Sequence, residues 1–313
     1  MRLALLFSGQ GQQTQEHLSF LREHADIEMS AALAESLKNV WTASPQPPPT
    51  LNTTFLTDNV LSANVIAQPL IFGFEMTWWA ELMPHLPQPV CAAGYSLGEM
   101  AACSAAGLFT SNEGVALCHE RARLMDSNTS GAVTMLAVLG ISEENVASIA
   151  SQHGLAIAIC NSPTHFVVTG AETAIEKSAA CFEAAGATKL NPIAVRTPSH
   201  THFLKSASDA FTINLVPYAQ RHLSFPVISA VTGKMAFTGK DAAKALATQI
   251  SSMLHWGDAL ETMTEMQPDV VLEIGPGNAL SKMFEDFAPS IPVRSVCDFK
   301  STQGVLGWLG RFN

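Results

Sequence analysis

Charged side chains are scarce in this chain, and the basic ones are outnumbered by the acidic ones. Only 14% of the 313 residues are charged, and the formal net charge at pH 7 is −10. This acidic balance argues against nucleic acid or an anionic membrane surface as the main partner. No apolar run approaches the about 18 residues of a membrane-spanning helix, and the apolar segment 3–7 is too short for a signal peptide. We therefore expect a globular, cytoplasmic protein.

The sequence also lacks the spacings of common metal and redox motifs. Its six cysteines include no C-x-x-C pair, and we expect buried, reduced thiols. No cluster of His, Cys or Asp has metal-ligand spacing, so no metal is expected. The turn Gly275-Pro276-Gly277 lacks the lysine of a phosphate-binding loop, and we expect it to be structural.

Hydrophobic residues make up 47% of the chain, which predicts a large core. Strand-like and helix-like segments alternate, which favours a mainly parallel sheet covered by helices on both faces. We predict an α/β fold in which residues 1–127 and 196–313 form a large α/β-hydrolase-like domain. Residues 128–195 show the order β-α-β-β-α-β and are predicted to form an inserted ferredoxin-like subdomain. The proline-rich stretch 45–49 is expected to be a stiff surface spacer.

Hydrophobic periodicity and turn residues predict the individual elements. In the large domain we expect strands at 2–7, 89–93, 226–231 and 270–274, and helices at 64–82, 99–106, 111–126, 202–214 and 239–264. In the inserted unit we expect strands at 133–139, 155–160, 165–169 and 188–195, and helices at 143–152 and 171–185.

The most informative motif is the G-x-S-x-G formed by Gly94 to Gly98. It lies between a short apolar segment and a helix-like segment, as in a nucleophile elbow. The glycines allow a sharp turn, and the hydroxyl of Ser96 is expected at the N-terminus of the following helix. Free backbone N–H groups there would stabilise a forming anion. The motif therefore predicts covalent acyl chemistry at Ser96.

Several further motifs appear in order along the chain, and together they resemble the malonyl-CoA:acyl-carrier-protein transacylase family. The family patterns are F-P-G-Q-G-x-Q, G-H-S-x-G-E, R-G-x-x-M, N-S-P, P-S-H, a Gln with a following Trp, and E-x-G-P-G. They match, in that order, residues 7–13, 94–99, 121–125, 161–163, 198–200, Gln249 with Trp256, and 273–277. The resemblance covers nearly the whole chain.

The resemblance implies a role for each matching residue. Ser96 would be the nucleophile and His200 its base, oriented by the backbone carbonyl of Gln249, so that Gln249→Ala is expected to cost little. The backbone N–H groups of Gln10 and Leu97 would form the oxyanion hole.

Two residues of the family pattern would line the substrate pocket. Arg121 would bind the free carboxylate of a malonyl group, and Asn161 would also contact the substrate. From the residues alone, Arg121 has as its alternative a helix-end cation that serves the macrodipole or pairs with Asp126. Asn161 is equally well interpreted as a turn former before Pro163. His200 is likewise open to a structural interpretation.

The implied reaction moves a malonyl group from malonyl-CoA to the thiol of an acyl carrier protein, with no bound cofactor. Such carriers are acidic, so a local basic patch is expected, for example Lys189, Arg196 or Lys205. Two departures from the family pattern stand out: Tyr95 replaces histidine and Ser8 replaces proline. We expect Tyr95 to reshape the pocket or to change how well the acyl-serine resists water.

Two other functions stay open on the sequence. A serine thioesterase or hydrolase would normally have its histidine late in the chain, whereas the last histidine here is His255. A catalytically silent subunit that docks a carrier protein within a larger complex would not need Ser96, His200 and Arg121. Within the acyltransferase interpretation, fatty acid synthesis, a free-standing polyketide acyltransferase and a malonate decarboxylase subunit remain as contexts.

Overall fold

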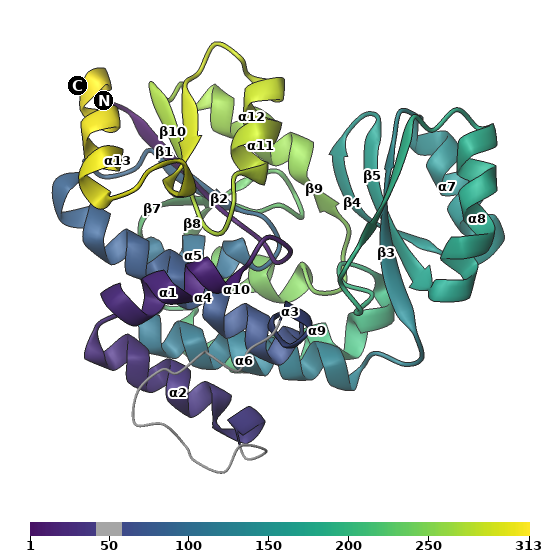
Figure 1. The fold of residues 1–313 in the computed structure, drawn as a ribbon, viewed down its shortest axis with the longest axis horizontal. Coiled ribbons are helices and arrows are strands. Elements are labelled where there is room, and N and C mark those ends of the chain that lie inside the picture. The colour runs from purple at the N-terminus through teal and green to yellow at the C-terminus, as the bar shows by residue number, and fades with distance from the viewer. Residues whose placement is uncertain (42–57) are drawn as a thin grey trace.

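The structure, a computed structural model, describes residues 1–41 and 58–313; the spacer expected at 45–49 lies outside them. At the centre of this part of the chain is a six-stranded sheet in the order β11-β10-β1-β2-β7-β8 (Figure 1). Its strand pairs are parallel except for β7 with β8. The strands are β1 (Leu3–Phe7), β2 (Cys91–Gly94), β7 (His222–Ile228), β8 (Met235–Thr238), β10 (Val270–Ile274) and β11 (Val293–Ser295). The predicted mainly parallel sheet is confirmed.

Helices cover both faces of this sheet because its central strand is apolar on both sides. All five residues of β1 are buried. Leu3, Leu5 and Phe7 belong to one core cluster, and Ala4 and Leu6 belong to another. Alternate residues of a strand point to opposite faces. A strand that is buried on both faces is typical of a parallel sheet in an α/β protein.

The first cluster draws on helices from both halves of the chain, and the second on two helices near the C-terminus. On the first side lie α1 (Gln15–His24), α2 (Ile27–Trp41), α4 (Asn64–Leu82), α5 (Gly98–Ala105), α6 (Ser111–Ser127), α9 (Lys205–Leu215), α10 (Gly239–Thr248) and α13 (Thr302–Leu309). On the second side lie α11 (Trp256–Glu265) and α12 (Ala279–Phe287). The short helix α3 (Asp58–Leu61) precedes α4. No helix of the described residues is long and apolar enough to cross a membrane.

A second sheet stands beside the first, in the order β6-β3-β5-β4-β9 (Figure 1). Its elements are β3 (Val133–Leu139), α7 (Glu143–His153), β4 (Ala156–Ser162), β5 (His165–Ala171), α8 (Glu172–Ala184), β6 (Lys189–Ile193) and the short β9 (Leu254–His255). The six elements predicted between 133 and 195 are all present in the predicted order. The edge strand β9 comes from outside this segment, and the boundaries 128 and 195 stay a prediction.

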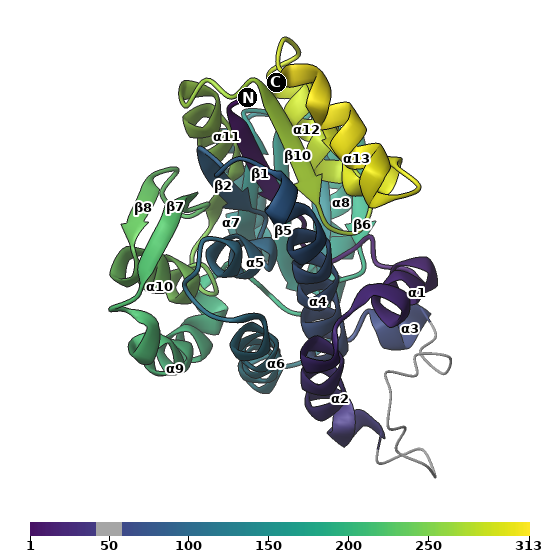
Figure 2. The same ribbon diagram turned by 90° about the vertical axis from the view of Figure 1, so that its left-hand side faces the viewer.

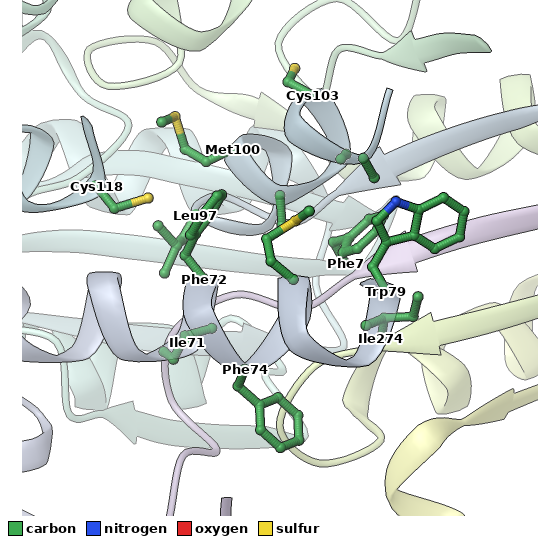
Figure 3. Close-up of a cluster of buried hydrophobic side chains, with 14 of the residues drawn as sticks. Phe7, Ile71, Phe72, Phe74, Trp79, Leu97, Met100, Cys103, Cys118 and Ile274 are labelled. Carbon is green, nitrogen blue, oxygen red and sulfur yellow. The ribbon is translucent and has the colours of Figure 1, made fainter. Parts of the chain in front are cut away.

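The helix α4 crosses the middle of the large unit, next to α1, α2, α5 and α6 (Figure 2). Nearly all of its residues are buried, including Pro69 within the helix. Figure 3 shows its side chains Phe72 and Trp79 packed among residues of β1, α5 and α6. A side chain at Gly114 of α6 would overlap the ring of Phe72, so glycine allows the close approach of the two helices. This core packs α4 against α5, the helix that follows the elbow.

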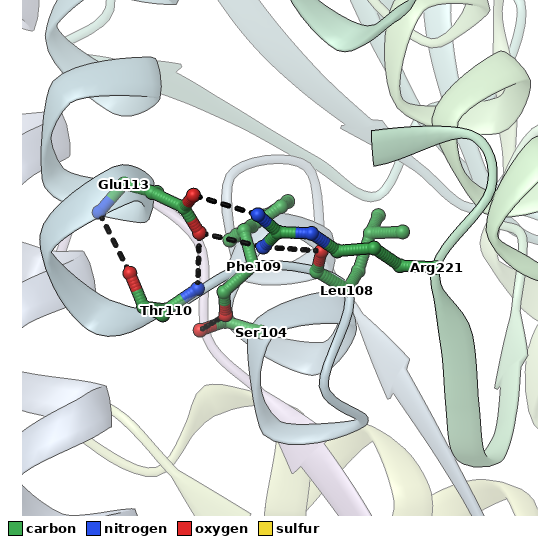
Figure 4. A network of polar contacts seen from close by, with 6 residues as sticks. All are labelled: Ser104, Leu108, Phe109, Thr110, Glu113 and Arg221. Carbon is green, nitrogen blue, oxygen red and sulfur yellow. Dashed lines mark hydrogen bonds and ion pairs between the residues drawn. The ribbon is translucent and has the colours of Figure 1, made fainter. Parts of the chain in front are cut away.

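A polar network ties the start of α6 to the start of β7 (Figure 4). The two terminal nitrogens of the Arg221 guanidinium, Nη1 and Nη2, donate to the carboxylate of Glu113 at 2.6 and 2.8 Å. These bonds lower the pKa of Glu113 to about 2. Glu113 also accepts the amide of Thr110, whose hydroxyl caps the helix. Because the ion pair is partly exposed, we expect it to add at most about 1 kcal/mol to the free energy of unfolding.

The structure differs from the sequence predictions in its shortest elements. The helices expected at 239–264 are α10 and α11, and the short strand β9 lies between them. The strand expected at 226–231 covers 222–228, and the strands β8, β9 and β11 were not predicted. Each has four residues or fewer, too few for a periodic pattern, and each depends on pairing with a distant strand.

Candidate active site

Ser96 lies at the sharp turn between β2 and α5, as the motif predicted. Its backbone is in the left-handed region, with φ of 55°, a conformation that non-glycine residues rarely adopt. A side chain at Gly94 would overlap the backbone of Glu99, and one at Gly98 would overlap the carbonyl of Phe7. The two glycines therefore let the elbow fold tightly against the end of β1.

His200 reaches Ser96 from a different segment of the chain. Its Nε2 lies 2.7 Å from Ser96 Oγ, and its Nδ1 lies 2.5 Å from the backbone carbonyl of Gln249. Because a carbonyl only accepts, Nδ1 carries the proton, and Nε2 is free to accept the hydroxyl proton of Ser96. The residue is buried and has φ of 63°. The nucleophile and its partner thus both sit in a strained conformation, which is common at functional sites.

The environment of His200 keeps its ring neutral. Burial and, to a lesser extent, the nearby charge of Arg121 lower the pKa of His200 to about 3, although the hydrogen bond to the Gln249 carbonyl acts in the opposite direction. A neutral imidazole at ordinary pH is the form that can accept a proton from serine.

Two backbone N–H groups beside Ser96 have no acceptor within the described chain: those of Gln10 and Leu97. Leu97 precedes α5, and Gln10 belongs to the loop that follows β1. This loop packs closely on the elbow, since a side chain at Gly9 would lie 2.7 Å from the carbonyl oxygen of Tyr95. Free donors in this position can stabilise an oxyanion on an acyl group held by Ser96.

A cavity of about 120 Å³ opens beside Ser96 and His200. Its polar side is formed by the two catalytic candidates with Gln10, Gln68 and Arg121. Its other side is apolar and comes largely from the small sheet and the segment after it, with Met135, Ile159, Val167, Ile193 and Val195. The cavity therefore lies between the two sheets.

Arg121 is the cation of this cavity, and its exposed fraction is only 1%. Its Nη1 donates to Gln68 Oε1 at 2.8 Å and its Nη2 to Gln249 Oε1 at 3.2 Å. Its Nε has no hydrogen-bond partner, and no carboxylate pairs with it among the described residues. Burial lowers its pKa to about 10, so it stays charged at neutral pH. A buried, unpaired guanidinium suits a ligand carboxylate.

The helix-end interpretation of Arg121 fails in this structure. Asp126, its expected partner, accepts hydrogen bonds from Asn64 at 2.6 Å and from Thr197 at 3.5 Å. That network joins α4, α6 and the segment before His200.

The model of the acyl transferase domain family matches residues 5–302. The chain belongs to the acyl transferase family. It is 30% identical over 320 residues to the malonyl CoA-acyl carrier protein transacylase of Haemophilus influenzae, covering 97% of this chain and 99% of that one. It is also 30% identical over 226 residues to the polyketide biosynthesis malonyl CoA-acyl carrier protein transacylase of Bacillus subtilis, covering 71% of this chain and 77% of that one.

A solved malonyl-transacylase of a type II polyketide system, in complex with its acyl-carrier protein, has the same fold. It superposes with a TM-score of 0.84 at 25% identity, covering 98% of this chain and 99% of that one. This acyltransferase is therefore similar along almost its whole length to a malonyl CoA-acyl carrier protein transacylase and to a malonyl-transacylase of a polyketide system.

The sequence analysis did not predict a role for Gln68, and for Gln249 it predicted a role of the backbone carbonyl only. Gln68, on α4, holds Arg121, and the side chain of Gln249 holds both Arg121 and the carbonyl of Ser96, the latter at 3.1 Å. Both are buried. A glutamine in the otherwise apolar stretch of α4 was the available signal for Gln68, because a buried amide needs polar partners.

Asn161 lies behind the cavity wall rather than on it. Its Oδ1 accepts the hydroxyl of Tyr95 at 3.1 Å, and its Nδ2 lies 3.3 Å from His165 Nε2. Tyr95 lines the cavity and packs edge-on against Trp256. Asn161 thus holds the residue that replaces the family's histidine.

The basic residues expected at a carrier-docking patch are all exposed. Lys205 is paired with Asp209 on the same helix. Lys189, on the edge strand β6, and Arg196, next to the cavity residue Val195, have no ion-pair partner among the described residues. Within those residues, no group of three or more His, Cys, Asp or Glu could hold a metal ion.

Proposed function

We propose that this acyltransferase moves a malonyl group from malonyl-CoA to the thiol of an acyl carrier protein through an acyl-serine. The observation that carries the proposal is Arg121, a buried cation with no carboxylate partner in the described part of the chain, in the same cavity as the Ser96–His200 pair. A nucleophile with its base supports acyl transfer, and the cation selects an acyl group with a free carboxylate. The names of the relatives support the same reaction.

In the first half-reaction, Ser96 Oγ attacks the thioester carbonyl of malonyl-CoA and its proton passes to His200 Nε2. The carbonyl oxygen becomes an oxyanion held by the N–H groups of Gln10 and Leu97. The C–S bond then breaks, and His200 returns the proton to the sulfur of CoA. The malonyl carboxylate pairs with Arg121 throughout, and this holds the ester carbonyl in place.

In the second half-reaction the carrier thiol gives its proton to His200 and attacks the malonyl-serine ester. Ser96 leaves with that proton, and the malonyl thioester departs on the carrier. An acidic carrier would meet the exposed Arg196, next to the cavity residue Val195, and Lys189, at the other end of the edge strand β6 from the cavity residue Ile193. The six free cysteines fit a reducing compartment, so we place the reaction in the cytoplasm.

Intact mass spectrometry tests the proposal. The protein is mixed with malonyl-CoA or acetyl-CoA, with Ser96→Ala as the control. We expect one malonyl adduct that is absent from the variant and is removed by a carrier protein bearing its thiol. Release of CoA without an adduct or an acceptor would favour the hydrolase, and no adduct with no release would favour a silent docking subunit.

The expectation that Gln249→Ala costs little is revised by the contacts of its side chain. We expect a loss of about 10-fold in kcat/KM, since removing a buried hydrogen-bond partner costs about 1–3 kcal/mol. Gln68→Ala is the matched control because Gln68 contacts Arg121 but not Ser96. Gln68→Ala should affect malonyl-CoA alone, whereas Gln249→Ala should also slow acylation by acetyl-CoA. Equal effects of the two variants on both substrates would contradict this division.

A further inference from the structure

The loop Ser8–Gln10 carries one of the two free amides beside Ser96, and two buried glutamates lie beneath it. Glu75 comes from the middle of α4 and Glu273 from β10. Both side chains have an exposed fraction of 0%. Neither has a part in the acyl transfer steps above, and burying two carboxyl groups without a cation is costly. The arrangement therefore calls for a function.

Glu273 is fully hydrogen-bonded. Its Oε1 accepts the hydroxyl of Ser8 at 2.8 Å and the amide of Leu280 at 3.2 Å, and its Oε2 accepts the amide of Ser281 at 2.7 Å. The two amides belong to the first turn of α12, whose N-terminal end favours negative charge. Burial raises the pKa of Glu273, and the hydrogen bonds from Ser281, Ser8 and Leu280 oppose that rise. These donors therefore favour the carboxylate form.

Glu75 has the opposite environment. Neither of its oxygens has a hydrogen-bond partner within the described chain. Burial raises its pKa well above the ordinary value, the charge of Glu273 adds to this, and the amide of Ser8 opposes it. This environment favours the neutral acid form of Glu75 over the carboxylate.

Glu75 and Ser8 meet beside one glycine. A side chain at Gly275, whose φ is 152°, would overlap the Ser8 hydroxyl and lie 3.0 Å from Glu75 Oε1. Glu75 and the Ser8 side chain thus face the same small space, and only glycine leaves it open. The loop also contacts the segment after Gly275 further along, since Gln12 Oε1 accepts the amide of Asn278 at 3.2 Å.

From this geometry we infer that Glu273, which accepts the Ser8 hydroxyl, and Glu75, which faces the Ser8 side chain across the space left by Gly275, hold Ser8 in place and so position the Gln10 amide for the oxyanion. Both are positioning residues that act through Ser8. The inference rests on the proposed function for the role of Gln10, and Ser8 is the residue that replaces the family's proline. Correct placement of an oxyanion donor is worth about 10²–10³-fold in rate, so a loosened loop should cost a measurable part of that.

A small alkyl fluorophosphonate tests the clamp independently of malonyl-CoA. Ser96 Oγ bonds to phosphorus, fluoride leaves and the serine proton passes to His200, with the phosphoryl oxygen in the oxyanion position. We expect Glu75→Ala and Ser8→Ala each to slow labelling of Ser96 by about 10-fold, through the rate at saturation rather than the half-saturating concentration. Glu75→Gln, which keeps a neutral group of the same shape, should stay within about 3-fold of the wild type.

The double variant Glu75→Ala/Ser8→Ala should lose little more than either single variant, since both act on one loop. Thr77→Val is the control on α4, because the Thr77 hydroxyl bonds only within its own helix. Thermal unfolding of each variant separates a loosened loop from a damaged core, and Ser8→Ala keeps the test open if Glu75→Ala does not fold. Unchanged labelling in folded Ser8→Ala, additive losses, or no labelling of the wild type would overturn the inference. Normal labelling with no malonyl adduct would instead overturn only the proposed function.

Discussion

Replacing His200 with alanine should slow acylation of Ser96 by malonyl-CoA by about 10³-fold, within the range of general base catalysis. His200 is the only group within hydrogen-bond distance of Ser96 Oγ among the described residues. The matched control is His202→Ala, because His202 is exposed and its ring centroid lies 4.2 Å from that of Phe203, with the two rings tilted. We expect that variant to keep its rate within about 2-fold. Rapid-quench mass spectrometry of a single turnover measures both rates, and similar losses in the two variants would reject His200 as the base.

The pH dependence of kcat/KM should report the low pKa of the same histidine. The neutral ring is the active form, so activity falls only when pH drops toward the pKa of about 3. We therefore expect no loss of kcat/KM near pH 6.5, the ordinary value for histidine. Since the charge of Arg121 contributes to the low pKa, Arg121→Gln should move the acid limb upward. A wild-type limb near pH 6.5 would contradict the buried, neutral state of His200.

Arg121→Gln should remove most of the preference for malonyl-CoA over acetyl-CoA. Two charge-assisted hydrogen bonds to a carboxylate are worth about 1.5–3 kcal/mol each, so the ratio of the two kcat/KM values should fall by about 100-fold or more. The ratio for Arg121→Lys should lie between those of the wild type and Arg121→Gln, because lysine keeps the charge but lacks the planar guanidinium.

Arg123→Gln is the matched control for Arg121, two residues further along α6. Its guanidinium is exposed and bonds to Glu120 at 2.6 Å, so we expect its substrate preference to be unchanged. Competition between the two thioesters, read as the masses of the adducts on Ser96, measures the ratio directly. A preserved malonyl preference in folded Arg121→Gln would show that the carboxylate binds elsewhere.

The position of the nucleophile could be predicted because every constraint on it is local. Gly94, Ser96 and Gly98 lie within five residues, and the strand and helix around them are short, uninterrupted patterns. The same holds for the six elements between 133 and 193, where each apolar period is complete within one segment. The pairing of Ser96 with His200 was predicted only through the resemblance, because 104 residues separate them.

Contacts made by side chains across the fold could not be predicted in this way. Arg121 finds Gln68 53 residues away and Gln249 128 residues away. Asn161 was expected to contact the substrate, but the bulk and the hydroxyl of Tyr95 place it one layer behind the cavity. The strand β9 joins the small sheet from outside the inserted segment. None of these long-range contacts can be predicted from the local hydrophobic periodicity of the sequence.

The sequence by itself determined the order of the elements, the elbow at Ser96 and the mainly parallel character of the central sheet, because backbone preferences and apolar periods act over a few neighbouring residues. The tertiary structure alone decided which polar groups meet in the interior. These are His200 with its neutral ring, Arg121 without a carboxylate partner among the described residues, and Ser8 with Glu273 and Glu75 around it. The reason is that burial makes each buried polar or charged group depend on its partners, and those partners are brought together only by packing between distant segments.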